Sequence, residues 1–371
     1  MTALAKFLLV GILVIGLPLL GAGAVPATWD EMLELPPRTS YVLHAPFSWL
    51  AFVFGCALVL AWVLPFIVQA IRGNCGEDLP PAERHAFPWW GWVGLLMGAT
   101  WWVLAWTRFP WFSVLQRHTF SPLWFSYILV VNALAHRRTG RCLMLRRPRF
   151  FLVLFPVSAV FWWFFEYLNR FVQNWRYVEA HVGPAGEFVS KPLAFAGAEY
   201  VIYATLAFST VLPAVLSTRE LLLSFRVFGR SRSFAPIRFS HPKRAAWIVL
   251  LLTGLGLACI GWLPDYLFPL LWVSPLLIVV SIQVLWGGRH VFSDIPRGDW
   301  RGVVAVAVAA LICGFFWEMW NYHSMAKWIY DVPFVHALPV FEMPILGYAG
   351  YLPFGLECAA LGDVLSPTDG S

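Results

Sequence analysis

Two stretches, far apart in the chain, carry the same order of acidic, amide and aromatic residues. Each has a Glu and an Asn three residues apart, then a Trp-x-Tyr sequence and then a second Glu. Residues three apart share one face of a helix, so we expect each Glu and its Asn to point the same way. The first stretch comprises Glu166, Asn169, Trp175, Tyr177 and Glu199, and the second comprises Glu318, Asn321, Trp328, Tyr330 and Glu342.

A carboxyl group among aromatic residues at the end of an apolar helix is suited to proton transfer. Burial disfavours the charged form of a carboxyl group, so a buried Glu can hold a proton near neutral pH and donate it. In this hypothesis Glu166 and Glu318 are the acids, and Glu199 and Glu342 are their partners. The two Asn side chains would orient neighbouring groups by hydrogen bonds. The four Trp and Tyr rings would form walls that stabilise a carbocation by cation–π contact.

The same residues also fit a purely structural role. Trp and Tyr anchor helix ends at membrane surfaces, where they form an interfacial belt. Glu199 and Glu342 each precede an apolar run, where a carboxylate would complement the helix dipole. Repetition of the whole order favours a functional site, although a duplication copies structural residues as well. Both interpretations are open at the level of sequence.

Composition identifies the class of protein. Of 371 residues, 60% are hydrophobic and only 12% are charged, whereas soluble domains carry about 25% charge. The net charge of +6 comes with Arg residues clustered at 136–149 and 218–244, which is a topology signal and does not indicate nucleic-acid binding. The six Cys residues are scattered without a Cys-x-x-Cys pair. We therefore expect a polytopic membrane protein with no disulfide framework, metal site or cofactor.

Apolar runs long enough to cross a bilayer predict an all-α bundle of about ten transmembrane helices. The first run could instead be a signal peptide, and we favour a retained helix. Because both basic loops belong in the cytoplasm, ten helices place both chain ends inside. We expect the membrane to be the inner membrane of a bacterium. The runs lie near residues 7–25, 47–71, 88–108, 120–136, 150–170, 194–217, 245–264, 266–286, 301–320 and 342–363.

The similarity of the two stretches extends to the helices before them. The sequence Pro122-Leu123-Trp124-Phe125-Ser126 is echoed by Leu270-Leu271-Trp272-Val273-Ser274. This predicts a duplicated unit of about four helices. Both units would begin on the cytoplasmic side, so they would be parallel and related by a pseudo-two-fold axis along the membrane normal. The predicted organisation is a prefix (1–87), a first repeat (88–217), a basic linker (218–244), a second repeat (245–363) and a tail (364–371).

The order of an acid after aromatic residues, then Trp-x-Tyr, then a Glu opening the next helix resembles the small integral-membrane lycopene cyclases. In that family a three-helix unit occurs twice, and acidic residues are thought to protonate the polyene without redox change. The resemblance covers about 120–217 and 268–363. It implies that Glu166 and Glu318 stand at the position of the acid, and Glu199 and Glu342 at the Glu of the third helix. The family usually has Asp at the first position and a Pro-x-Glu-Glu pair at the second.

The sequence therefore predicts acid–base, non-redox modification of an isoprenoid or carotenoid-like substrate, as in an isomerase or lyase. The expected partners are membrane lipids or the lipophilic substrate. A transporter is disfavoured because the ionisable groups lie at the outer margin of the predicted helices and not at mid-membrane. A non-catalytic scaffold or assembly subunit is the other alternative, with the aromatic surface as the contact.

Overall fold

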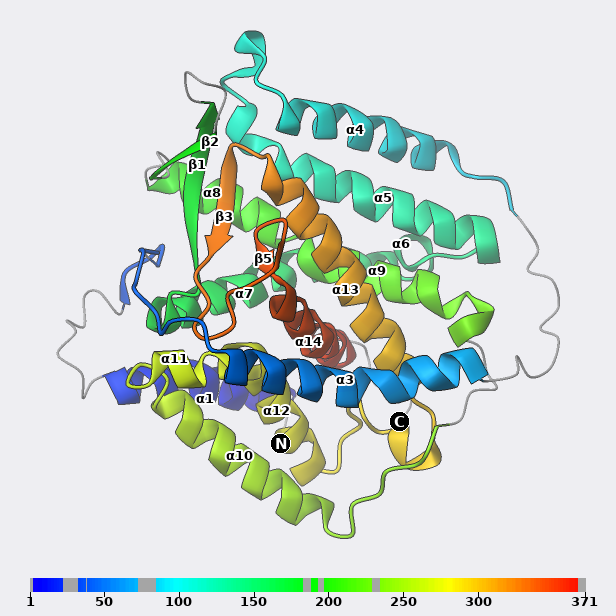
Figure 1. Ribbon diagram of the computed structural model, residues 1–371. Coiled ribbons are helices and arrows are strands. Elements are labelled where there is room, and N and C mark those ends of the chain that lie inside the picture. The colour runs from blue at the N-terminus through cyan, green and yellow to red at the C-terminus, as the bar shows by residue number, and fades with distance from the viewer. Residues whose placement is uncertain are drawn as a thin grey trace.

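The computed structural model describes residues 3–22, 33–37, 39–72, 85–182, 188–192, 197–228 and 234–365. Within these ranges the chain is mostly helical, with a small sheet at one side of the bundle (Figure 1). Part of the predicted basic linker (229–233) and the predicted tail beyond residue 365 lie outside the described residues. The mostly helical fold predicted from the sequence is confirmed.

Helices lie at each of the ten predicted apolar runs. Two runs differ from the prediction in detail, because 194–217 is divided into two helices at Ser209-Thr210 and the helix of 342–363 begins only at Tyr351. The helices of these runs are α1 (Ala3–Ala22), α3 (Trp49–Arg72), α4 (Trp89–Trp106), α5 (Phe120–Thr139), α7 (Pro148–Val172), α8 (Ala198–Phe208), α9 (Val211–Leu223), α10 (Pro242–Ala258), α12 (Pro269–Leu285), α13 (Arg301–Tyr322) and α14 (Tyr351–Leu365). Two short helices, α6 (Leu143–Arg146) and α11 (Pro264–Leu267), lie in connections.

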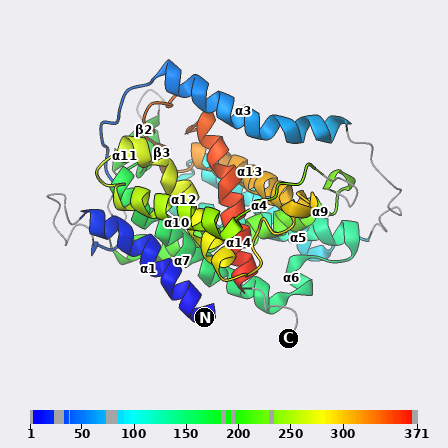
Figure 2. The same cartoon turned by 90° about the horizontal axis from the view of Figure 1, so that it is seen from below.

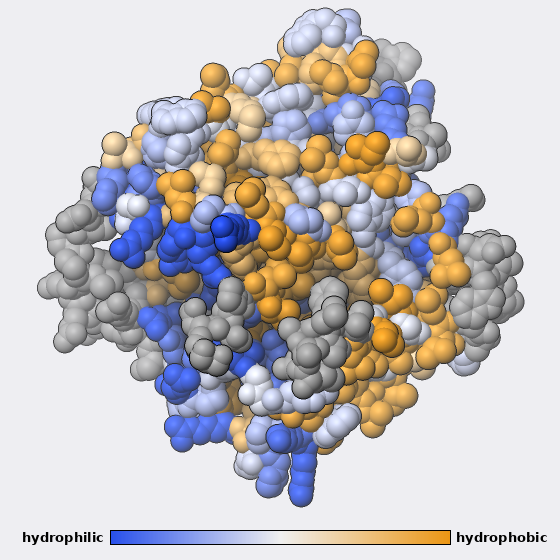
Figure 3. Space-filling view, turned by 180° about the vertical axis from the view of Figure 1, so that it is seen from behind, coloured by the Kyte–Doolittle hydropathy of each residue, from blue (hydrophilic) through white to orange (hydrophobic). Residues whose placement is uncertain are grey.

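Several helices have the length and hydropathy that a membrane requires. Among the described residues, four segments are long and apolar enough to cross a bilayer, namely Trp49–Val68, Pro148–Val172, Ala198–Leu223 and Arg301–Tyr322. The third of these combines α8 and α9. Large apolar side chains are also exposed on the outer helices, and Figure 3 shows hydrophobic side chains over a wide area of one face. These features are compatible with a membrane protein, because lipid is an apolar solvent.

Helix α14 lies in the middle of the bundle (Figures 1 and 2), and α9 packs against it and against α5, α7 and α13. Its residues from Val211 to Thr218 are all buried. Two side-chain hydrogen bonds join it to α5: Tyr127 Oη lies 2.9 Å from Thr218 Oγ1, and Asn132 Nδ2 donates to Ser217 Oγ at 2.9 Å. On the other side α13 packs against α14. Helices α7 and α13, which carry Glu166 and Glu318, thus both pack against α9.

A three-stranded antiparallel sheet, in the order β2-β1-β3, joins the ends of α7 and α13. Its strands are β1 (Trp175–Val182), β2 (Phe188–Pro192) and β3 (Ala326–Tyr330). The all-α prediction omits this sheet. In β1 apolar residues alternate with polar ones over Val178-Glu179-Ala180-His181-Val182, which is the period of a half-buried strand. Both Trp-x-Tyr sequences are therefore in strands, directly after the helices that carry the acids.

Candidate functional site

The two candidate acids occupy equivalent places. Glu166 lies near the end of α7 and is 1% exposed, and Glu318 lies near the end of α13 and is 0% exposed. Neither forms an ion pair with a basic side chain in the described part of the chain. A buried carboxyl group without a counter-ion is costly in its charged form, so its hydrogen-bond donors determine how it is accommodated.

Three donors converge on one oxygen of Glu166. Tyr177 donates to Oε1 at 2.6 Å, Trp162 Nε1 donates at 3.0 Å, and Trp175 Nε1 donates at 3.2 Å. Trp162 stands one turn earlier on the same helix, whereas Trp175 and Tyr177 come from β1. The predicted Trp-x-Tyr sequence therefore does reach its acid, with both its aromatic residues as hydrogen-bond donors.

Glu318 is bound in a similar way by two phenols. Tyr330 of β3 donates to Glu318 Oε1 at 2.8 Å, and Tyr351 of α14 donates to the same oxygen at 2.7 Å. Trp328 Nε1 donates to the Tyr330 hydroxyl at 2.8 Å, which makes a short chain of hydrogen bonds leading to the carboxyl group. The second oxygen of each acid, Oε2 of Glu166 and of Glu318, is buried and has no hydrogen-bond partner among the described residues.

One substitution between the two sites explains why their donors differ. Four residues before Glu166 stands Trp162, and four residues before Glu318 stands Gly314. A Cβ atom at Gly314 would lie 2.4 Å from the ring of Tyr351. The missing side chain therefore makes room for Tyr351 to reach Glu318 from α14. Where the first site takes a donor from its own helix, the second takes one from a neighbouring helix.

The two Asn residues bind backbone and join helix to strand. Asn169 Nδ2 donates to the Trp175 carbonyl at 2.8 Å, and its Oδ1 accepts from Asn174 N at 2.9 Å. Asn321 Nδ2 donates to the Trp328 carbonyl at 2.8 Å, and its Oδ1 accepts from Trp328 N at 2.9 Å. Asn169 thus binds the start of β1, and Asn321 binds the middle of β3. Their orienting role concerns the Trp-x-Tyr sequences, and the structure gives them no contact with the cavity described below.

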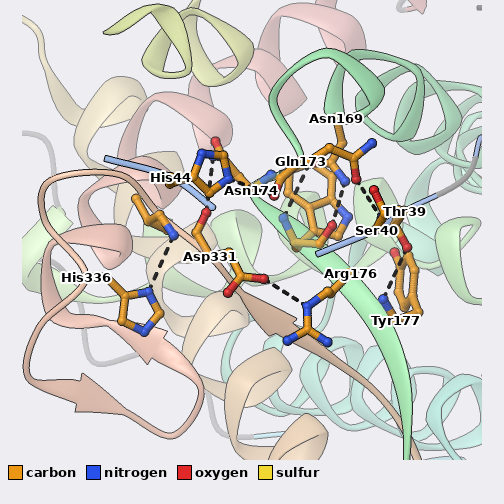
Figure 4. Close-up of polar contacts among 12 residues, drawn as sticks. Thr39, Ser40, His44, Asn169, Gln173, Asn174, Arg176, Tyr177, Asp331 and His336 are labelled. Carbon is orange, nitrogen blue, oxygen red and sulfur yellow. Dashed lines mark hydrogen bonds and ion pairs between the residues drawn. The ribbon is translucent and has the colours of Figure 1, made fainter. Parts of the chain in front are cut away.

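Residues in the segment before α3 and directly after β3 also hold β1 in place (Figure 4). Tyr177 N donates to Thr39 Oγ1 at 3.3 Å, and Arg176 Nε donates to Asp331 Oδ2 at 2.9 Å. Asp331 follows β3 directly, so this ion pair joins the two strands that carry the Trp-x-Tyr sequences. His44 Nδ1, in the same segment as Thr39, lies 2.6 Å from Asp265 Oδ1. The strand that presents Tyr177 is thus fixed from both sides.

The aromatic residues of both stretches line one cavity of about 140 Å³. The cavity lies where the ends of α7 and α13 meet β1, β3 and α8. Its lining includes the Trp and Tyr residues that bind the two acids, but neither Glu166 nor Glu318. The two carboxyl groups are therefore bound by side chains that line the cavity, without lining it themselves. The aromatic lining consists of Phe120, Trp162, Trp175, Tyr177, Tyr200, Tyr203, Phe208, Trp272, Trp317, Trp328, Tyr330 and Tyr351.

The phenols next to the acids stay protonated over the physiological range. Burial, together with the neighbouring Glu166, raises the pKa of Tyr177 well above its ordinary value. Burial and Glu318 have the same effect on the pKa of Tyr330. A phenol that keeps its proton can donate to a carboxyl oxygen, and can pass on one proton only as it receives another.

Glu199 and Glu342 do not join the two acids. Glu199 lies in the first turn of α8, as predicted, but its side chain is 49% exposed and its Oε1 lies 3.6 Å from His118 Nε2. Glu342 does not open a helix, because it lies in the turn between β4 (Pro339–Val340) and β5 (Met343–Pro344), and it pairs with Lys327. No hydrogen bond therefore joins either residue to Glu166 or Glu318 in the described part of the chain. Both lie instead beside residues that line the cavity.

Several site residues are not among the predicted site residues. Tyr351, Trp272 and Trp317 line the cavity, and the first of these binds Glu318. The sequence signal for Tyr351 is indirect. Gly314 is an isolated Gly near the aromatic end of an apolar helix, and such a Gly often has a packing reason. Trp272 belongs to the repeated Leu-Trp-x-Ser sequence, whose other Trp, Trp124, is fully buried in contact with Trp317.

Comparison of the chain with protein-family models, with curated proteins and with solved structures gave no significant match. Function is therefore inferred from the geometry of the site.

Proposed function

We propose that this protein modifies a lipophilic, unsaturated isoprenoid by acid–base chemistry without redox change. One observation carries the proposal: two buried carboxyl groups, one bound by a Tyr and two Trp and the other by two Tyr, take all these hydrogen bonds from side chains that line a single cavity. Acid–base catalysis needs a group that gives a proton and a group that takes one. Two carboxyl groups around one apolar cavity meet this need.

The proposed step starts with a protonated carboxyl group. Its proton passes to the adjacent Tyr oxygen while the Tyr hydroxyl proton passes to one carbon of a substrate double bond. A C–H bond forms, the π bond breaks, and the carbocation that results is stabilised by the surrounding rings through cation–π contact. Loss of a proton from a neighbouring carbon, through Tyr to the other carboxylate, restores a double bond. The product is an isomer of the substrate, either rearranged or cyclised.

The size of the cavity limits what part of the substrate enters. Cavities of about 150 Å³ hold one benzene-sized ring, and the cavity here measures about 140 Å³. It fits one end group of a long isoprenoid. The rest of such a chain would lie outside the cavity, in the lipid that surrounds the helices.

The contacts also support a duplication. At both sites the Tyr of Trp-x-Tyr donates to the Glu, and the Asn donates to the carbonyl of the Trp. These corresponding bonds favour two units at 88–217 and 245–363 related by a pseudo-two-fold axis. In this proposal the ten helical runs span the inner membrane of a bacterium with both chain ends inside. The likeness to the small lycopene cyclases is part of the same proposal, because an acid before Trp-x-Tyr in two copies is what the resemblance is based on.

The test of this function is the isoprenoid profile of the host. Deletion of the gene should change the profile of extractable isoprenoids in mass spectrometry, and expression of the native protein should restore it. Expression of Glu166→Gln or Glu318→Gln should not restore it, although each variant accumulates in the membrane. An unchanged profile after deletion would rule out the proposal.

A further inference from the structure

One end of the aromatic cavity is polar. Arg117, His118 and Lys327 are its lining residues with basic side chains. The turn that carries Arg117 and His118 packs against β3, which carries Lys327, so the three lie at the same end. A cavity with an aromatic body and one polar end selects ligands that have a polar group at the end that enters.

Lys327 has a hydrogen-bond donor to spare at this end. Lys327 is only 8% exposed. Its ammonium group donates to the Tyr322 carbonyl at 2.8 Å and to the carboxylate of Glu342. An ammonium group has three N–H donors. The third has no hydrogen-bond acceptor in the described part of the chain. Its position in the cavity lining allows this donor to bind an oxygen atom of a ligand.

The charges at this end favour a neutral ligand. Arg117 pairs with the buried Glu179, with Nε 2.7 Å from Oε1, and Lys327 pairs with Glu342. His118 faces the carboxylate of Glu199. Each basic side chain thus already has an acidic partner, so an added phosphate or carboxylate would meet acidic groups as well as basic ones. A hydroxyl or carbonyl oxygen accepts a hydrogen bond without adding charge.

We infer that the cavity takes the end of an isoprenoid that carries a neutral oxygen, a hydroxyl or a carbonyl, and that Lys327 binds this oxygen. This inference rests on the proposed function, because it concerns the same cavity. Lys327 is then a specificity-determining residue. It holds the polar end at β3 and so sets which double bond lies beside the Tyr hydroxyls.

The experiment compares three ligands with the same chain: farnesene, farnesol and farnesyl diphosphate. Equilibrium binding of each labelled ligand is measured with the detergent-purified full chain, as the native protein and as Lys327→Met. We expect Lys327→Met to weaken farnesol binding about tenfold, the effect of one hydrogen bond from a charged group. Farnesene binding should change less than twofold. Comparing variants for one ligand cancels differences in how the ligands enter micelles.

Two further variants keep the test decisive. Because Lys327→Met leaves the carboxylate of Glu342 unpaired, the double variant Lys327→Met/Glu342→Gln removes both charges and should show the same selective loss. Lys191→Met, at an exposed position of β2, should bind all ligands as the native protein does.

Equal weakening of farnesene and farnesol would overturn the inference, since Lys327 would then only shape the cavity. Tightest binding of the diphosphate, lost in Lys327→Met, would overturn the neutral ligand class. Either result leaves the proposed function in place. Failure of all three ligands to bind the native protein would contradict the proposed function itself.

Discussion

Trp175 of β1 lies directly opposite Tyr330 of β3, and two positions along the same ladder Tyr177 lies opposite Trp328. The two Trp-x-Tyr sequences therefore run antiparallel, so that the Trp of each lies opposite the Tyr of the other. Each Tyr nevertheless binds the Glu of the helix that precedes its own strand. This arrangement brings the Tyr donors of two acids from distant parts of the sequence into the lining of one cavity.

Loss of the Tyr177 hydroxyl should lower the rate of product formation more than loss of the Tyr330 hydroxyl. Tyr177 is the phenol that bonds Glu166, whereas Glu318 is bonded by both Tyr330 and Tyr351. If the phenols relay protons, Tyr177→Phe should lower the rate about 10²-fold or more, within the range of general acid–base effects. Tyr330→Phe should lower the rate less than tenfold, because Tyr351 remains. Rates of product formation by the purified variants measure both effects.

The double variant Tyr330→Phe/Tyr351→Phe should be as impaired as Tyr177→Phe. Tyr348→Phe is the matched control, because its hydroxyl donates to the Val340 carbonyl and bonds neither acid. Equal and small losses for all of these variants would show that the phenols do not carry protons.

Gly314 should be intolerant of a side chain. Its Cβ would lie 2.4 Å from the Tyr351 ring, and such overpacking costs about 1–3 kcal/mol. Gly314→Ala should therefore lower the melting temperature and weaken the bond between Tyr351 and Glu318. Gly302→Ala is the control on the same helix, where the new atom would meet Arg219 at an ordinary 3.5 Å. A Gly314→Ala protein as stable and as active as Gly302→Ala would show that this close packing is unimportant.

His118 should make stability depend on pH. Burial is the main cause that lowers its pKa in the folded protein, against the opposing effect of Glu199. Above the unfolded pKa of about 6.5 the ring is neutral in both states, and the folded state keeps its full stability. As pH falls below that value, the unfolded chain binds a proton before the folded chain does, so stability decreases until the pH passes the folded pKa.

Thermal unfolding between pH 8 and pH 5 measures this effect. His118→Gln should lose less stability on acidification than the native protein does. His241→Gln changes an exposed ring and should follow the native protein. Parallel losses in the native protein and His118→Gln would show that His118 does not cause the acid sensitivity.

Much of the fold can be predicted from the sequence because the helical runs are apolar and long. The positions of Glu166 and Glu318 at helix ends follow from the same pattern, as does the placement of the Trp-x-Tyr sequences next to them. The first strand could have been recognised from the alternation in 178–182. The short strand at 326–330 has too few residues for that pattern to be evident.

The partners of the acids could not be predicted, because they depend on contacts between distant segments. Glu342 is followed by an apolar run and so resembles a helix start, yet the helix begins only at Tyr351. Lys327, in β3, forms an ion pair with Glu342. The Tyr351 ring packs against Gly314, where a side chain would keep it from reaching Glu318. Both relations require knowledge of which helices pack together.

The central claim is that Glu166 and Glu318 move protons to and from a substrate double bond. The most direct measurement is incubation of the purified protein with a linear polyene in D₂O, followed by mass spectrometry. The native protein should yield a product that is an isomer of the substrate and carries deuterium. Glu166→Gln and Glu318→Gln should lower deuterium incorporation about 10²-fold or more, since Gln keeps the shape and the acceptor oxygen but has no acid proton.

Glu357→Gln is the matched control for this measurement. Glu357 is also buried, at 2% exposure, but it accepts a hydrogen bond from Leu276 N and does not line the cavity. This variant should incorporate deuterium as the native protein does. Undiminished incorporation by both Glu166→Gln and Glu318→Gln, or recovery of unlabelled substrate from the native protein, would contradict the claim.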